Sequence, residues 1–202
     1  MNKKKIKIED FIKSYKSQLV ESVLNLDTNK LKQIIKILET TIVNNRTIFT
    51  CGNGGAASVS NHFLCDFNKG IKYFSNKFLK PRVISLSNSI ENITAIANDE
   101  NFEKIFENQL ENYIGNGDLI FALSCSGKSK NILNVLKYAK KNNCKTILIT
   151  GFNKKKFKFV DIHLDINIKN YGISEDLFQA IMHISSQFIK FKHNKKNIKN
   201  IL

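Results

Sequence analysis

The chain has 202 residues, 42% hydrophobic and 24% charged, which is the composition of a soluble globular protein with its own core. It has neither the ~18-residue apolar run of a membrane span nor a signal-peptide pattern, so we expect one domain over residues 1–202, in the cytoplasm, without a membrane partner. Its net charge of +15 comes almost entirely from scattered lysines, with only Arg46 and Arg82 as arginines, which indicates solvated faces and no nucleic-acid partner.

Two amphipathic helices are predicted ahead of the first strand. Residues 7–25 and 29–45 carry apolar side chains at helical spacing. Asp27 and Thr28 between them supply turn and helix-capping chemistry. The apolar stripes of both helices need a partner, which is either the sheet or another subunit.

Strands and helices alternate through the rest of the chain. Strands are expected at 47–51, 82–87, 119–123, 146–150 and about 160–166, with helices from Gly55, at 90–97, 101–114, after the turn at 124–129 to about 142, and at 174–191. An irregular basic segment is expected at 69–80 and a fraying Lys/Asn tail at 192–202. This alternation predicts a parallel, doubly wound α/β sheet, which binds ligands at the carboxyl ends of its strands.

The first of two small-residue turns follows the strand at 47–51. Cys51-Gly52-Asn53-Gly54-Gly55-Ala56-Ala57 leads into a helix, and free N–H groups at a helix N-terminus favour an anion. Gly52, Gly54 and Ala57 also fit a dinucleotide fingerprint. That pattern requires a carboxylate at the end of the second strand, where the chain has Leu86-Ser87-Asn88-Ser89 instead. The dinucleotide interpretation is therefore disfavoured.

The second turn is Ser124-Cys125-Ser126-Gly127-Lys128-Ser129, directly after the most apolar strand. Three hydroxyls and several backbone donors at a helix N-terminus suit a phosphate monoester. An ordinary capped helix would have the same residues. A nucleotide P-loop is excluded, because its first glycine would fall at Ala122, inside the strand.

Polar side chains also recur on two helices. His62 and Asp66 are four residues apart, and Glu175, Gln179, His183 and Gln187 form a line through the apolar pattern of the last helix. His62, Asp66, Glu175 and His183 together make a nitrogen and oxygen ligand set for zinc or a related divalent ion. They could equally supply an acid and a base without metal, or form a buried hydrogen-bond network.

The two turns, Asn98-Asp99 and His183-Ile184-Ser185-Ser186-Gln187 together resemble the sugar isomerase (SIS) domain family, in its phosphoheptose isomerase branch. The resemblance covers nearly the whole chain. It implies a flavodoxin-like three-layer α-β-α sandwich with a five-stranded parallel sheet, assembled into a homotetramer with active sites at subunit interfaces, for which the helices of residues 1–45 would be used. It also implies the ketose–aldose isomerisation of sedoheptulose 7-phosphate to D-glycero-D-manno-heptose 7-phosphate through an enediol, for the heptose of lipopolysaccharide or capsule.

Residue roles follow from the same resemblance. The phosphorylated sugar would be held by Asn53, Gly54, Gly55, Asn98, Asp99, Ser124, Cys125, Ser126, Ser129 and Gln179. Asp66 and His183 would be catalytic, and one divalent ion per subunit, zinc, would be held by His62, Asp66, Glu175 and His183. A base must remove a carbon-bound proton, and a cation would stabilise the enediolate.

The chain departs from the family pattern at four places. Asp66 stands for a glutamate, Glu175 for a glutamine, Ala56 for a serine, and Asn88-Ser89 for a substrate-contacting aspartate. These changes leave the exact phosphosugar open. They also keep an alternative function, a non-catalytic SIS protein that binds a phosphosugar or a partner, as the SIS factor that binds the bacterial replication initiator does.

Overall fold

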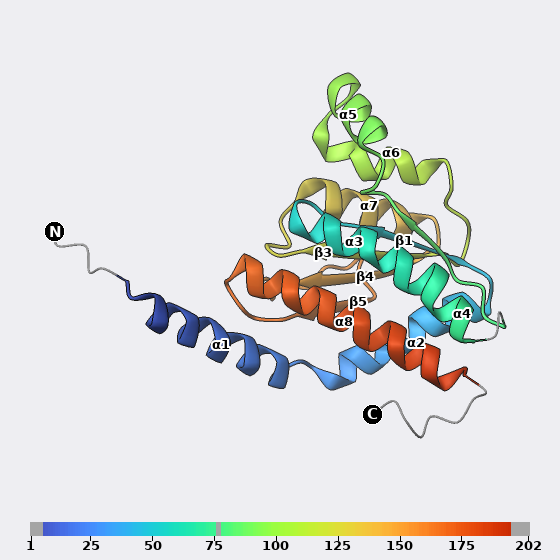
Figure 1. Ribbon diagram of the computed structural model, residues 1–202. Coiled ribbons are helices and arrows are strands. Elements are labelled where there is room, and N and C mark those ends of the chain that lie inside the picture. Colours follow the sequence, from blue (N-terminus) through green and yellow to red (C-terminus); the bar gives the residue numbers. More distant parts are fainter. Residues whose placement is uncertain (1–5, 76–77, 195–202) are drawn as a thin grey trace.

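The computed structural model describes residues 6–75 and 78–194, and its centre is a five-stranded parallel sheet (Figure 1). The strands are β1 (Thr47–Cys51), β2 (Arg82–Ser85), β3 (Leu119–Ser124), β4 (Lys145–Thr150) and β5 (Ile162–Asp165). They lie in the order β2-β1-β3-β4-β5, the flavodoxin-like order of doubly wound sheets. The predicted α/β fold is thereby confirmed.

The helices account for most of the remaining described chain. They are α1 (Ile8–Leu24), α2 (Thr28–Val43), α3 (Gly55–Cys65), the π-helical segment η1 (Asp66–Ile71), α4 (Lys72–Phe74), α5 (Ile90–Asp99), the 3-10 turn η2 (Phe102–Lys104), α6 (Ile105–Glu111), α7 (Lys130–Lys141) and α8 (Tyr171–Lys192). The two N-terminal helices are confirmed, and the side chain of Asp27 caps α2 by accepting from the Lys30 amide at 3.0 Å. α8 begins earlier than predicted because Asn170 caps it through the Ile173 amide.

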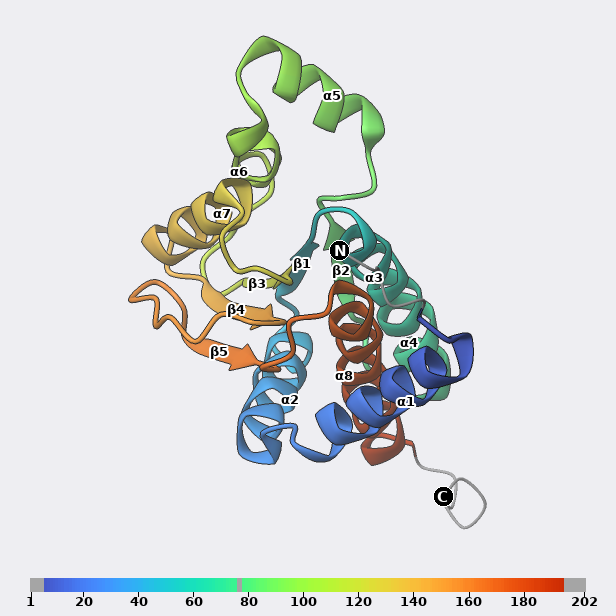
Figure 2. The same cartoon turned by 90° about the vertical axis from the view of Figure 1, so that its left-hand side faces the viewer.

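Helices cover both faces of the sheet (Figure 2). Side chains on a strand alternate between faces, so Phe121 of β3 packs into the core shared with α2, α3 and α8, while Ile120 and Ala122 pack against α6 and α7. All six residues of β3 are buried. α1 lies outside these layers and reaches the body mainly along α8, where Tyr15 donates to Asp176 at 2.7 Å.

The prediction of an irregular segment at 69–80 is wrong over its first part. The chain from Gly55 continues as helix through η1 and α4 to Phe74. Phe67 and Ile71, four residues apart, are fully buried, and Phe67 stacks on Phe63 with ring centroids 4.1 Å apart. Burial of this apolar stripe stabilises the segment as a helix. The neighbouring lysines make the helical pattern of apolar residues difficult to recognise in the sequence.

The exposed edge of the sheet at β2 is covered by one side chain from the same segment. The amide of Asn68 donates to the Val83 carbonyl at 2.9 Å and accepts from the Val83 N–H at 2.8 Å. Asn68 thus occupies the two hydrogen-bonding groups that another strand would use.

The predicted tail at 192–202 is wrong at its start, and residues 195–202 lie outside the described residues. Lys192 still belongs to α8. Both Lys192 and His193 contact the Glu39 carboxylate of α2, with Nε2 of His193 2.6 Å from Oε1. The end of α8 is therefore attached to α2.

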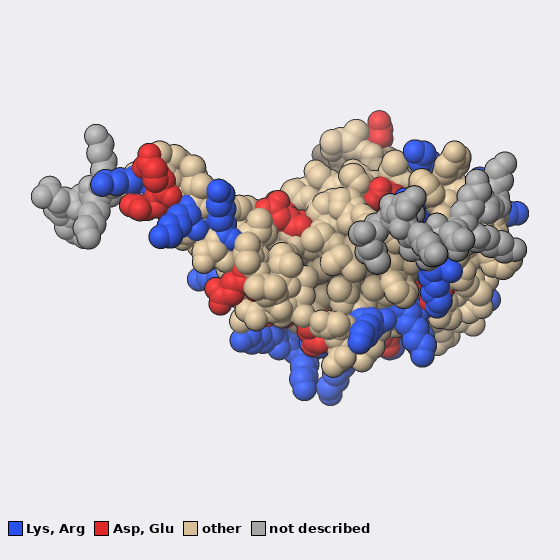
Figure 3. Space-filling view, turned by 60° about the horizontal axis from the view of Figure 1, so that its bottom comes forward, with Lys and Arg blue, Asp and Glu red and all other residues tan. Residues whose placement is uncertain are grey.

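The surface in Figure 3 carries lysines and arginines in several separate groups, with acidic side chains between them. No helix within the described ranges is both long and apolar enough to cross a membrane.

Candidate active site

The two small-residue turns lie side by side at the carboxyl end of the sheet. They meet because β1 and β3 are neighbours, with Cys51 paired to Ala122, while β1 connects onward to β2 on its other side. Asn53 of the first turn and Asn131 of α7 exchange two hydrogen bonds of 3.0 Å through their amides. These bonds fix the distance between the turns.

A cavity of about 140 Å³ opens between the turns. Its lining residues are Asn53, Ala56, Leu123, Ser124, Cys125, Ser126, Ser129, Tyr171 and Glu175. Ser129 is the N-cap residue of α7, yet its side chain makes no capping hydrogen bond. An ordinary cap therefore does not explain this serine, whose hydroxyl lies at a helix N-terminus beside the cavity.

Two glycines shape the turns. Gly54 and Gly127 both have φ of +58°, a conformation that a side chain disfavours. At Gly127 an added Cβ would also lie 2.6 Å from Nδ2 of Asn153, which donates to the carbonyls of Ser126 and Gly127. The second turn is thus held by the side-chain amide of Asn153.

Cys125 is present in the cavity wall as a thiol. Burial, with a smaller contribution from the Glu175 carboxylate, raises the pKa of Cys125 to about 11. A protonated thiol is a poor nucleophile and metal ligand. Cys125 therefore shapes the cavity and does not supply thiolate chemistry.

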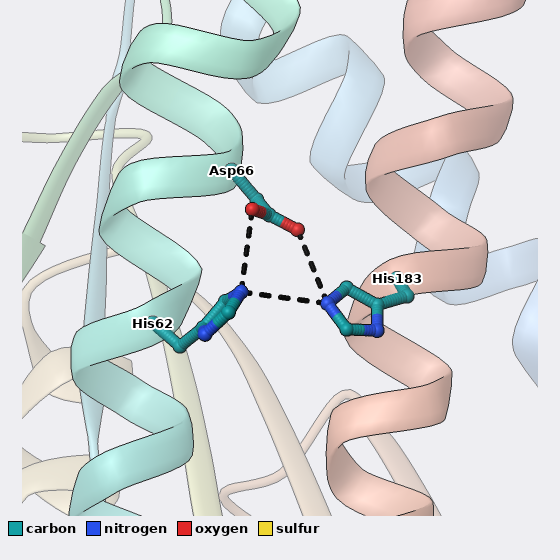
Figure 4. Close-up of side chains that lie close together, drawn as sticks. All are labelled: His62, Asp66 and His183. Atoms are coloured by element: carbon teal, nitrogen blue, oxygen red, sulfur yellow. Dashed lines mark hydrogen bonds and ion pairs between the residues drawn. The ribbon is translucent and has the colours of Figure 1, made fainter.

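Further along α3 and α8 from the cavity, three side chains from α3, η1 and α8 point toward one another (Figure 4). Nε2 of His62 lies 3.4 Å from Oδ1 of Asp66, Nε2 of His183 lies 3.4 Å from Oδ2 of Asp66, and the two nitrogens are 3.4 Å apart. His62, Asp66 and His183 form the group that we call the triad. These three residues belong to the candidate ligand set that the sequence predicted.

The triad fits a divalent metal ion. Tetrahedral zinc with bonds of about 2.0–2.2 Å has ligand atoms about 3.3–3.6 Å apart. The two imidazole nitrogens are 3.4 Å apart, and each lies 3.4 Å from a different oxygen of Asp66. One potential ligand atom from each of the three residues lies within 4.8 Å of the other two. Two imidazole nitrogens and a carboxylate are also the donors that zinc and related ions prefer.

Glu175, the fourth predicted ligand, lies outside the triad. Its carboxylate packs against the start of α3, where a Cβ added to Gly55 would be 2.2 Å from Oε2 of Glu175. Burial, followed by the neighbouring Asp176 carboxylate, raises the pKa of Glu175, and the Ala56 N–H partly opposes that rise. Gly55 thus provides the space in which Glu175 faces the cavity.

Asn98 and Asp99 are not brought to the cavity. They are exposed at the end of α5, where Asn98 donates to Asp99 at 2.9 Å. In Figures 1 and 2, α5 stands away from the sheet, above α6. Within the described part of one chain, these two predicted substrate contacts lie apart from the others.

Sequence reasoning missed the groups that hold the site in place. Asn131 and Tyr171 carry no motif signal. The buried hydroxyls of Thr50, Ser60 and Ser85 form a hydrogen-bonded chain, with Thr50 to Ser60 at 2.7 Å and Ser60 to Ser85 at 2.9 Å. This chain attaches α3 to β1 and β2 just ahead of the triad.

Comparison with known proteins gives one consistent family. The model of the SIS domain matches residues 10–151. The phosphoheptose isomerase of Helicobacter pylori (strain P12) is 36% identical over 195 residues, which cover 94% of this chain and 100% of that protein.

Solved structures agree on the fold. The phosphoheptose isomerase GmhA from Neisseria gonorrhoeae superposes with a TM-score of 0.80 at 19% identity, covering 92% of this chain and 100% of that one. The sugar isomerase domain of the RpiR transcription factor from Sphaerobacter thermophilus superposes with a TM-score of 0.53 at 10% identity, covering 90% and 92% of the two chains. At these identities the likeness concerns the fold alone.

Proposed function

Because the chain belongs to the SIS domain family, we propose that it is a sugar-phosphate ketose–aldose isomerase acting on sedoheptulose 7-phosphate. The triad between α3 and α8, two helices that also supply the cavity residues Ala56 and Glu175, is the observation that carries this proposal. The product would be D-glycero-D-manno-heptose 7-phosphate, for the heptose of a surface polysaccharide, lipopolysaccharide or capsule. Residues 1–202 would act as one SIS domain.

The cavity would receive the phosphate. Ser124, Ser126 and Ser129 present hydroxyls there, and the N-terminus of α7 adds a favourable dipole. Asn53, between the turns, would orient the sugar. The reacting carbons would then extend toward the α3–α8 side, where the triad lies.

Asp66 and His183 would move the proton. Each carboxylate oxygen of Asp66 lies 3.4 Å from one of the two histidine nitrogens, and one of these oxygens would leave its histidine to take the carbon-bound proton. His183 would serve the substrate oxygen, which must gain and lose a proton as the carbonyl moves between carbons. The triad would hold one divalent ion, zinc, in each subunit. This ion would stabilise negative charge on the two substrate oxygens.

We also propose a homotetramer with active sites at subunit interfaces. Asn98 and Asp99, exposed on a helix that stands away from its own cavity, would then contribute to the site of a neighbouring subunit. α1 would supply contact surface.

The test is turnover of sedoheptulose 7-phosphate by the unaltered chain, Asp66→Asn and His183→Ala. Each variant should lose about 10²–10⁴-fold in kcat, the usual contribution of a general acid or base. Asp10→Asn, an exposed carboxylate on α1, is the matched control and should keep full activity. Full turnover by either site variant would contradict these roles.

A phosphosugar-binding regulatory protein is the second candidate. It is favoured by the Glu175 carboxylate in the cavity wall, which repels a phosphate, and by Ala56, which offers no hydroxyl there. A panel of ketose and aldose phosphates separates the two functions. Binding without turnover of any member would support the regulatory protein.

A further inference from the structure

A fourth polar side chain reaches the triad from α8. The side-chain amide nitrogen of Gln179 lies 2.9 Å from Nε2 of His183, one turn further along the same helix. That nitrogen is the atom of His183 that faces His62 and Asp66. Gln179 therefore ends beside the point where the three side chains converge.

The two ends of the Gln179 amide can exchange places. Oxygen and nitrogen of a side-chain amide differ only by rotation about its last torsion, and the hydrogen-bond partner decides which one faces a neighbour. When Nε2 of His183 gives its lone pair to a cation, it no longer accepts from an N–H. The amide oxygen, a ligand for hard and borderline cations, is then the favoured atom on that side.

Glu175 is occupied elsewhere. Its carboxylate sits at the start of α3, in the space that Gly55 leaves, and it lines the cavity with the serines. Residues 175 and 179 are one helical turn apart on the same side of α8, so either position could supply a ligand by spacing alone. The contacts distinguish them, because Gln179 touches His183 whereas Glu175 touches the backbone of α3.

Charge favours the amide as well. Two neutral imidazoles, one carboxylate and one amide leave a divalent ion with one net positive charge, whereas a second carboxylate would neutralise it. A positive centre stabilises a developing enediolate better than a neutral one.

We propose that Gln179, and not Glu175, supplies the fourth protein ligand of the divalent ion. Relative to the family pattern, the ligand position has then moved one turn along α8 in this chain. The inference rests on the proposed metal site of the triad and is independent of which phosphosugar is converted. It leaves Glu175 as a residue of the substrate cavity.

The replacement of Glu175 by Gln179 as the fourth ligand is tested by zinc affinity. The affinity of chelator-stripped protein is measured by competition with a chromophoric chelator. Gln179→Ala should weaken zinc binding by at least about 10- to 100-fold, the range for disturbed metal surroundings. Glu175→Ala should leave zinc binding nearly unchanged, because its carboxylate faces the cavity and the start of α3 and not the triad. Gln187→Ala, an exposed glutamine one turn beyond His183, is the matched control. Circular dichroism of each variant checks the fold.

Gln179→Glu separates a ligand from a hydrogen-bond donor. A carboxylate binds zinc but has no N–H, so a ligand role predicts zinc affinity equal to or above that of the unaltered chain. Loss of affinity in Gln179→Glu as large as in Gln179→Ala would overturn the ligand role. Loss of zinc affinity in Glu175→Ala, with no loss in Gln179→Ala, would overturn the proposal that Gln179 replaces Glu175 as the ligand. Failure of the unaltered chain to bind zinc would remove the metal site of the proposed function itself, which distinguishes the two failures.

Discussion

At the scale of single residues, the hydroxyl of Ser129 does not take part in capping its helix. The residue occupies the N-cap position of α7 but makes no side-chain capping bond, and it lines the cavity. In contrast, Asp27, Ser89 and Asn170 do cap their helices. Ser129 is therefore available for an anion.

Ser129→Ala should raise KM for the phosphosugar by about 10- to 100-fold with little change in kcat, since a hydrogen bond to a charged group contributes about 1.5–3 kcal/mol. Steady-state kinetics and inhibition by inorganic phosphate measure it, and the inhibition constant should rise by a similar factor. The melting temperature should stay close to that of the unaltered chain. A fall in stability with unchanged KM would show that the hydroxyl serves the helix instead. Ser17→Ala, an exposed serine of α1, is the control.

The sequence predicts part of the site at this scale. His62 and Asp66 share a helical face, and His183 interrupts an apolar stripe, so periodicity indicates that these polar side chains need partners. The choice between Glu175 and Gln179 does not follow, because both belong to one polar line. It depends on the space beside Gly55, which only the packing of α3 on α8 defines.

At the scale of elements, the contact between the end of α8 and α2 depends on charge. Burial alone would raise the pKa of Glu39, but hydrogen bonds from Lys192 and His193 outweigh it, so the pKa of Glu39 is lowered. A carboxyl with a lowered folded pKa stabilises the fold above its unfolded value of about 4.3. That contribution is lost as the pH falls through the folded value.

Glu39→Gln should therefore lower the free energy of unfolding at pH 7, and the difference from the unaltered chain should shrink as the pH falls below about 4.3. Urea unfolding at pH 7, 5, 4 and 3 measures this difference. Glu21→Gln, an exposed carboxylate on α1, controls for general charge effects. A difference that stays constant down to pH 3 would contradict an electrostatic origin.

Strand positions were predicted within about two residues, because buried parallel strands are nearly continuous apolar runs between turns. The π-helical segment and α4 were not predicted. Their helical signal consists of Phe67 and Ile71 among basic and polar residues, and a π turn shifts the register of the apolar face. Local propensity does not encode such a shift.

At the scale of the whole molecule, α1 presents apolar side chains to solvent. Val20 and Leu24, one helical turn apart, are 58% and 79% exposed, whereas Tyr15 on the other side of the helix contacts α8. Figure 1 shows α1 extending well beyond the layered body. Apolar side chains gathered on a projecting helix mark a surface for association.

Val20→Asp and Leu24→Asp should therefore shift the chain toward smaller assemblies, because association would bury the new charge. Light scattering coupled to size exclusion gives the mass of each variant. Asn142→Asp adds the same charge at an exposed position away from α1 and should have a smaller effect. Equal masses for all of these chains would contradict a contact through this face.

The amide of Asn68 has a consequence for how copies of the chain can misassemble. An uncovered parallel strand at a sheet border would accept a strand of another molecule, and repeated acceptance leads to fibres. At β2 this border is closed by a single amide that copies the hydrogen bonding of a peptide group. Loss of this one side chain would thus reopen the border of the sheet and make the protein prone to aggregate.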